Sequence, residues 1–118
     1  MGDLSKNFSR HEFACKCGCG FDTADIELVT VLQDVRDHFN RAVTINSGCR
    51  CVEYNRQIGG APDSQHTKCR AADIVVEDTP PRVVHFYLSE QYDGRFGLGR
   101  YDSFTHIDTR SGGAARWG

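Results

Sequence analysis

The chain has 118 residues, of which 39% are apolar and 25% are charged, and its formal net charge is -2. A chain of this length builds one domain around a single modest core, and its composition lies inside the globular range and outside the disordered one. Acidic and basic residues are interspersed and form no basic stripe that would neutralise phosphates, which argues against nucleic acid as a partner.

The first segment, residues 1–22, is rich in Cys and Gly and shows little periodicity. This composition predicts an irregular N-terminal segment pinned by its cysteines. The opening "MGDLSKNFSRHEF" has no apolar region after a basic one, and no later stretch approaches about eighteen consecutive apolar residues. We therefore expect a protein made in the cytoplasm without a signal peptide, and no membrane insertion.

An amphipathic helix is the first regular element that the pattern predicts. Apolar residues recur at steps of three and four from an N-cap at Asp22 or Thr23 to about His38. "AVTINS" (42–47) is typical of a short strand, and a single helical turn is expected over 52–57 before a Gly- and Pro-containing loop.

The second half of the chain is expected to complete a sheet. "AADIVVE" (71–77) predicts a buried strand, and the pair Pro80-Pro81 opens a second helix through about Tyr92. "FGLGRY" and "FTHIDT" are typical of a hairpin, and "ARW" of an edge strand. Helices and strands do not alternate regularly, so residues 1–118 are predicted to form one α+β domain, with a small mixed or antiparallel sheet flanked by helices.

Three side chains could form a metal site. His66 lies in the loop before the strand that carries Asp73, and His106 lies on a predicted neighbouring strand whose alternation aims residues 104, 106 and 108 at one face. Two imidazoles and one carboxylate leave the fourth tetrahedral position of zinc open to water, as a catalytic site requires. The spacing of His66 and Asp73 alone is equally compatible with two polar residues that flank a strand.

Longer segments carry a family resemblance. "FSRHEFACKCGCGFD", "INSGCRCVEYNRQIGGAPDSQHTKCRAADIVV", "GLGRYDSFTHIDTR" and the closing "ARW" together resemble the zinc D-Ala-D-Ala carboxypeptidase family, peptidase family M15, and its small phage and bacterial members. The family pattern Ser-x-His-x-x-Gly-x-Ala-x-Asp holds two zinc ligands. Ser64, His66 and Asp73 match it, with the alanine at Ala71 or, shifted by one, at Ala72.

The resemblance implies a hedgehog/DD-peptidase-like fold and hydrolysis of an amide bond in peptidoglycan stem peptides. It implies one catalytic Zn²⁺ held by His66, Asp73 and His106, and a place of action at the cell wall, for example as a phage endolysin or tail-associated lysin. We expect a monomer whose partner is the peptidoglycan peptide. Three bonds are candidates for cleavage: D-Ala-D-Ala, L-Ala-D-Glu and a cross-bridge.

The general base is the least determined role. Many family members carry an acid three residues before the last histidine, where this chain has Ser103. Asp108, two residues past His106 on the same strand face, is the favoured base, and the alternative role for an acid there is to orient the ligating imidazole. Asp102 is a second candidate, or else a hairpin-turn residue.

Arg50 matches a family arginine that resembles an anchor for the substrate carboxylate or the developing oxyanion. The alternative is an ordinary surface ion pair. Three further residues could line the cleft or simply pack: Gln65, Tyr54 and Tyr101. Trp117 is expected to pack near the terminus.

Six cysteines remain to be explained. Cys69 stands where the family usually has glycine, which would strain a positive φ there unless the loop adjusts or Cys69 is tied to another cysteine. A four-thiolate zinc site at Cys15, Cys17, Cys19 and Cys51 and a disulfide from an N-terminal cysteine to Cys51 are both open, and either would staple the first segment to the loop of Arg50.

Two other functions compete with a peptidase. A catalytically weak or inactive zinc-containing module that binds the cell wall would share the fold, and Ser103 in place of the usual acid favours it. A hedgehog-type signalling domain would share a related zinc fold, but the chain is small and no export signal is visible.

Overall fold

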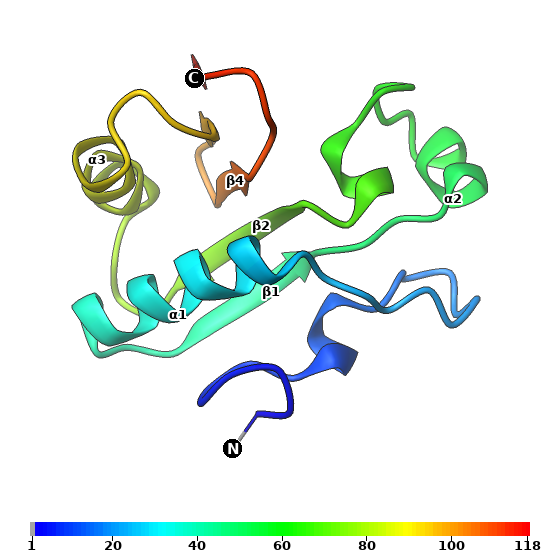
Figure 1. Cartoon of the computed structure of the whole chain (residues 1–118), viewed down its shortest axis with the longest axis horizontal. Coiled ribbons are helices and arrows are strands. Elements are labelled where there is room, and N and C mark those ends of the chain that lie inside the picture. Colours follow the sequence, from blue (N-terminus) through cyan, green and yellow to red (C-terminus); the bar gives the residue numbers. More distant parts are fainter. Residues whose placement is uncertain (1) are drawn as a thin grey trace.

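The computed structural model describes residues 2–118, so Met1 of the predicted 1–22 segment lies outside the described residues. Within this range the chain forms three α-helices, two 3₁₀ helices and a five-stranded mixed sheet, which confirms the predicted α+β class (Figure 1). The elements in chain order are η1 (Arg10–Phe13), α1 (Ile26–Phe39), β1 (Val43–Ser47), α2 (Val52–Gln57), η2 (Gln65–Lys68), β2 (Ala71–Val76), α3 (Pro81–Gln91), β3 (Gly97–Arg100), β4 (Thr105–Asp108) and β5 (Ala115–Trp117).

The strand order across the sheet is β1-β2-β4-β3-β5. Neighbouring strands are antiparallel except β3 and β5, which are parallel. The predicted hairpin is therefore the pair β3 and β4, and the predicted edge strand is β5. This order puts β4 at the centre of the sheet with β2 beside it, although about thirty residues of sequence separate the two strands.

Helix α1 begins later than the sequence indicates. Its N-cap is Asp25, whose carboxylate accepts the Leu28 N–H at 3.3 Å, so the predicted start at Asp22 or Thr23 was wrong. The Asp25 carboxylate also accepts the hydroxyl of Thr109 at 2.9 Å, a tertiary contact that selects this residue as the cap. Helix α3 begins at Pro81 as predicted, because proline has the φ that a first helical position needs.

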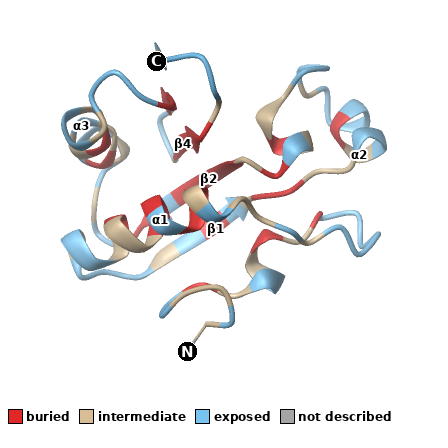
Figure 2. Cartoon of the chain, viewed as in Figure 1, coloured by how far each residue is buried: buried red, intermediate tan, exposed pale blue. Residues whose placement is uncertain are grey.

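Both long helices share one apolar core with the sheet. Helix α1 packs against β2, and α3 packs against β3 and β4. Along β2 the core side chains alternate, with Ala72, Ile74 and Val76 buried among the helices, and Ile107 of β4 is fully buried in the same cluster. Figure 2 shows the buried residues gathered on β2 and on the adjoining side of α1. The polar residues between them, Asp73 and His106, consequently belong to the opposite face of the sheet.

The irregular N-terminal segment adds two aromatic side chains to this core. Phe8 and Phe13 are both almost completely buried. The carbonyl of Phe13 accepts the Cys49 N–H at 2.8 Å, which joins the segment to the loop after β1. Among residues 2–118, no helix is both long and apolar enough to cross a bilayer.

Candidate metal centre

Two site residues face each other across adjacent strands. Asp73 of β2 and His106 of β4 are direct partners in the antiparallel register. Their side chains therefore leave the same face of the sheet side by side, and His106 Nδ1 lies 2.9 Å from Asp73 Oδ1. On β3 the residue opposite His106 is Gly99, where an added Cβ would collide with the Trp117 indole, so glycine leaves room for that ring beside the site.

His66 approaches from the short helix η2. Ser64 caps this helix by accepting the His66 N–H at 3.2 Å. The imidazole is buried and directs Nε2 to within 3.3 Å of Asp73 Oδ2. The ligand atoms of His66, Asp73 and His106 all lie within 4.8 Å of one another, so these three side chains could hold a metal ion. The structure thus brings together the three residues that the sequence nominated.

Each imidazole is oriented by a hydrogen bond from its outer nitrogen, the ring nitrogen that faces away from Asp73. His66 Nδ1 lies 2.7 Å from the carbonyl oxygen of Gly48, which can only accept, so this nitrogen carries the proton. His106 Nε2 lies 2.8 Å from Asp108 Oδ2 and donates to that carboxylate in the same way. When a ring carries only this one proton, its other nitrogen presents a lone pair toward Asp73. Lone pairs facing a carboxylate repel unless a proton or a cation lies between them, and two nitrogens with one carboxylate oxygen suit zinc.

The charges of the site are mutually dependent. Burial opposes ionisation of Asp73, but its hydrogen bonds with His106 and His66 outweigh that effect and hold the pKa of the carboxyl below its ordinary value. Burial likewise lowers the pKa of His106, and the hydrogen bonds to Asp108 and Asp73 outweigh it, so the net shift is upward. A metal ion between His106 Nδ1 and the Asp73 carboxylate would satisfy both groups, as a proton between them does.

Asp108 is fully buried and shared between His106 and Arg110. Its two oxygens lie 2.8 Å from Nε and Nη2 of Arg110, a bidentate pair, while Oδ2 also accepts from His106. Burial raises the pKa of Asp108, but the hydrogen bonds from Arg110 and His106 outweigh it, so the carboxyl titrates below its ordinary range. Gly97, opposite Asp108 in β3, has no side chain to obstruct this pair.

Arg50 borders the same site. Its Nη2 lies 3.6 Å from Asp73 Oδ2, its Nε donates to the hydroxyl of Ser47 at 3.2 Å, and its Nη1 donates to the side-chain oxygen of Asn55 at 3.2 Å. The Arg50 N–H donates to the carbonyl of His66 at 3.0 Å. The guanidinium is therefore held next to the three candidate ligands, partly buried rather than free on the surface.

The site lies in a cleft of about 640 Å³. Of the residues nominated from sequence as cleft walls, Gln65 and Tyr101 line it and Tyr54 does not. Asp102 is exposed on the turn between β3 and β4 and borders a different hollow. Trp117 lines the cleft, where its indole N–H donates to the Tyr101 hydroxyl at 2.9 Å.

Three charged residues that line the cleft were not predicted from the sequence: Asp63, Lys68 and Arg110. Asp63 and Lys68 flank His66 along the chain and are exposed. Arg110 lies just beyond the end of β4, and its position two residues past Asp108 was the one local signal that could have suggested their pairing. For Asp63 and Lys68 the sequence offers no comparable signal.

The six cysteines separate into two groups. Cys49 and Cys69 form a disulfide, so Cys69 is tied to another cysteine. Cys69 caps η2 in the left-handed conformation with a φ of 56°, the positive φ that a glycine at this position would accommodate without strain. The remaining four, Cys15, Cys17, Cys19 and Cys51, are free and cluster together.

The α+β domain presents a buried His-Asp-His set in a cleft, and such a set could hold a metal ion of the kind that hydrolases use. Residues 6–108 match the family model described as Peptidase M15, and the chain therefore belongs to the M15 peptidase family. This confirms the resemblance carried by the sequence motifs and implies a peptidase. The comparison with curated proteins gives no significant match.

Proposed function

We propose that this protein is a zinc-dependent peptidase that hydrolyses an amide bond in peptidoglycan stem peptides. Membership in the M15 peptidase family supports the reaction class. The observation that supports metal binding is the convergence of His66 Nε2, His106 Nδ1 and the Asp73 carboxylate. The other nitrogen of each imidazole is already hydrogen-bonded to an acceptor. The proposal places the enzyme at the cell wall, as a phage lysin would be, with the peptide as its partner.

His66, Asp73 and His106 would hold the ion. Zinc bound there would lower the pKa of its water to roughly 7 and polarise the scissile carbonyl. Arg50 can act in two ways, because its Nη2 lies 3.6 Å from Asp73 Oδ2, next to the proposed ion. Its guanidinium can bind a substrate carboxylate or stabilise an oxyanion at the reacting carbon. The exposed cation Lys68, also on the cleft wall, adds positive charge that favours an anionic peptide end.

The geometry favours a positioning role for Asp108. A general base must reach the attacking water, and Asp108 is fully buried with its oxygens directed at His106 and Arg110. Asp108 and Asp102 were the bases that the sequence suggested, and Asp102 lies outside the cleft lining. Asp63 is exposed on the cleft wall and carries none of these contacts. We propose that Asp63 takes the proton of the water and passes it to the leaving amine, because it is the exposed acid among the residues that line the cleft.

The test is hydrolysis of defined cell-wall peptides. Zinc-loaded protein is incubated with a stem pentapeptide and with cross-linked peptide fragments, and products are identified by mass spectrometry. We expect release of free D-alanine or of a new amino group, loss of the product on chelation, its return with added zinc, and no product with His106→Ala. Asp63→Asn should lower kcat strongly, while Asp102→Asn should leave it unchanged.

A second candidate is a zinc-containing module that binds the cell wall without cutting it. Two observations favour it: Ser103 stands at the position where the family resemblance places an acid, and Asp108 is already committed to Arg110. Protein that retains zinc and sediments with purified cell walls, but releases no product from any of these peptides, would identify this function and exclude the peptidase.

A further inference from the structure

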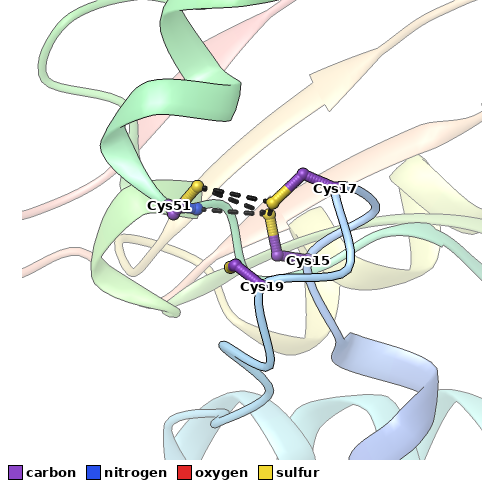
Figure 3. A group of neighbouring side chains, drawn as sticks. All are labelled: Cys15, Cys17, Cys19 and Cys51. Atoms are coloured by element: carbon purple, nitrogen blue, oxygen red, sulfur yellow. Dashed lines mark hydrogen bonds between the residues drawn. The ribbon is translucent and has the colours of Figure 1, made fainter.

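A second cluster of metal-ligating side chains lies away from the cleft. Cys15, Cys17 and Cys19 of the N-terminal segment meet Cys51, which follows Arg50 in the loop after β1, and their sulfurs all lie within 4.8 Å of one another. Figure 3 shows the sulfurs of Cys15 and Cys17 directed at that of Cys51, with Cys19 beside them. We propose that these four cysteines bind a structural zinc ion that fastens the N-terminal segment to the loop of Arg50.

The spacing of the sulfurs supports zinc. Cys15 Sγ lies 3.4 Å from Cys17 Sγ and 3.8 Å from Cys51 Sγ, and Cys17 Sγ lies 3.7 Å from Cys51 Sγ. Four thiolates at about 2.3 Å from one tetrahedral zinc lie about 3.8 Å from each other. The sulfurs of a disulfide lie about 2.0 Å apart. The distances among Cys15, Cys17 and Cys51 are thus close to the edges of a zinc tetrahedron, and the Cys19 sulfur lies within 4.8 Å of the other three.

The backbone explains how such a tight Cys-x-Cys-x-Cys spacing can converge. The Gly18 N–H donates to the Cys15 carbonyl at 3.2 Å, and Gly18 adopts a φ of 81°, so the chain reverses between Cys15 and Cys19. This turn directs alternate side chains toward one centre. The sulfurs can therefore meet although the intervals between the cysteines are shorter than the two to four residues usual in zinc sites.

Amide groups around the cluster are placed as donors to sulfur. The Cys51 N–H donates to Cys15 Sγ at 3.4 Å, and the Tyr54 N–H donates to Cys51 Sγ at 3.4 Å. Such hydrogen bonds stabilise thiolates over thiols and orient them toward a metal. On binding, four S–H bonds lose their protons to solvent and four Zn–S bonds form, without any change of oxidation state.

The ion would reinforce the loop that carries Arg50. Cys51 adjoins Arg50, Arg50 bonds the backbone of His66, and Cys49 bonds both Phe13 and, through its disulfide, Cys69. The segment from Cys49 to Cys51 is therefore held at every residue. A small domain with a modest core gains order from such a link exactly where substrate recognition needs it.

Zinc content of purified protein tests the proposal independently of peptidase activity. We expect two zinc ions per chain in the native protein, and one in each of two double variants, His66→Ala/His106→Ala and Cys17→Ser/Cys19→Ser. Cys17 and Cys19 are exposed, so this variant should keep its fold, which circular dichroism checks. Lys16→Ser, on the same loop between two ligands, is the matched control and should keep both ions.

Cobalt provides a second measurement on unmutated cysteines. The His66→Ala/His106→Ala protein loaded with Co²⁺ should show the intense sulfur-to-metal charge-transfer absorption of a thiolate site, and Cys17→Ser/Cys19→Ser should lack it. The proposal is overturned if the His66→Ala/His106→Ala protein binds no metal, or if alkylation and mass spectrometry find disulfides among these four cysteines in freshly isolated protein.

Discussion

Replacing Asp108 with asparagine separates its two candidate roles. In the native site four donors reach its oxygens: His106 Nε2, and Nε, Nη2 and the backbone N–H of Arg110. Asparagine offers one oxygen and one NH₂ group, so either His106 or Arg110 then faces a donor instead of an acceptor. Because Asp108 is fully buried and His106 is also buried, water cannot replace a lost hydrogen bond between these two side chains.

The magnitude follows from these contacts. Breaking a buried ion pair by neutralising one partner costs about 3–5 kcal/mol, and for a domain of this size about 4 °C of Tm accompanies each kcal/mol. Asp108→Asn should therefore lower the Tm of metal-free protein by roughly 12–20 °C. Loss of the acceptor that orients His106 should also weaken zinc binding about 10- to 100-fold.

Thermal unfolding followed by circular dichroism measures the first effect, and competition with a chromophoric chelator measures the second. Asp102→Asn is the control, because this residue is exposed and should change neither quantity. One result would refute the positioning role and identify Asp108 as the base. The Asp108→Asn variant would keep the native Tm and zinc affinity, but its peptidase activity would no longer fall as the pH is lowered.

Three further predictions concern pH, Arg50 and the disulfide. Asp73 and Asp108 have lowered pKa values, so in metal-free protein their contribution to the free energy of unfolding should be present above about pH 4 and lost as the pH falls further. The pKa of His106 is raised, so its contribution should be present below about pH 6.5 and lost as the pH rises. Urea titrations over this pH range measure both effects, and a constant free energy of unfolding would contradict the prediction. Arg50→Ala should raise KM about 10- to 100-fold for a peptide with a free carboxylate, while Arg56→Ala, an exposed arginine paired with Glu53, should not; equal kinetics for both would exclude the anchor. Without the disulfide, Cys49→Ser/Cys69→Gly should be about 1 kcal/mol more stable in urea than Cys49→Ser/Cys69→Ala, because only glycine adopts the φ of 56° without strain, and equal stability would show that the loop relaxes.

The sequence was most informative where short-range periodicity set the structure. Alternation along "FTHID" correctly predicted that Phe104, His106 and Asp108 reach the same cleft. The strand over residues 71–77 was predicted with one extra residue, and helix α2 was predicted at the bounds observed. The convergence of His66 on Asp73 depended on the family resemblance, because a spacing of seven residues is common to many unrelated loops.

Contacts between distant segments could not be predicted in the same way. Nothing local reveals that Thr109 selects Asp25 as the N-cap of α1, or that Cys69 pairs with Cys49. Trp117 packs near the terminus, beside the His106 ring, and it also lines the cleft and donates to Tyr101, because β5 joins the edge of the sheet beside β3. Each of these outcomes depends on the order of the strands, which periodicity does not encode.

The most direct test of the metal centre is an anomalous difference map from crystals of zinc-loaded protein, collected at the zinc absorption edge. We predict a peak about 2.0–2.2 Å from His66 Nε2, His106 Nδ1 and an Asp73 carboxylate oxygen. Crystals saturated with zinc that show no peak within bonding distance of these three atoms would contradict the account.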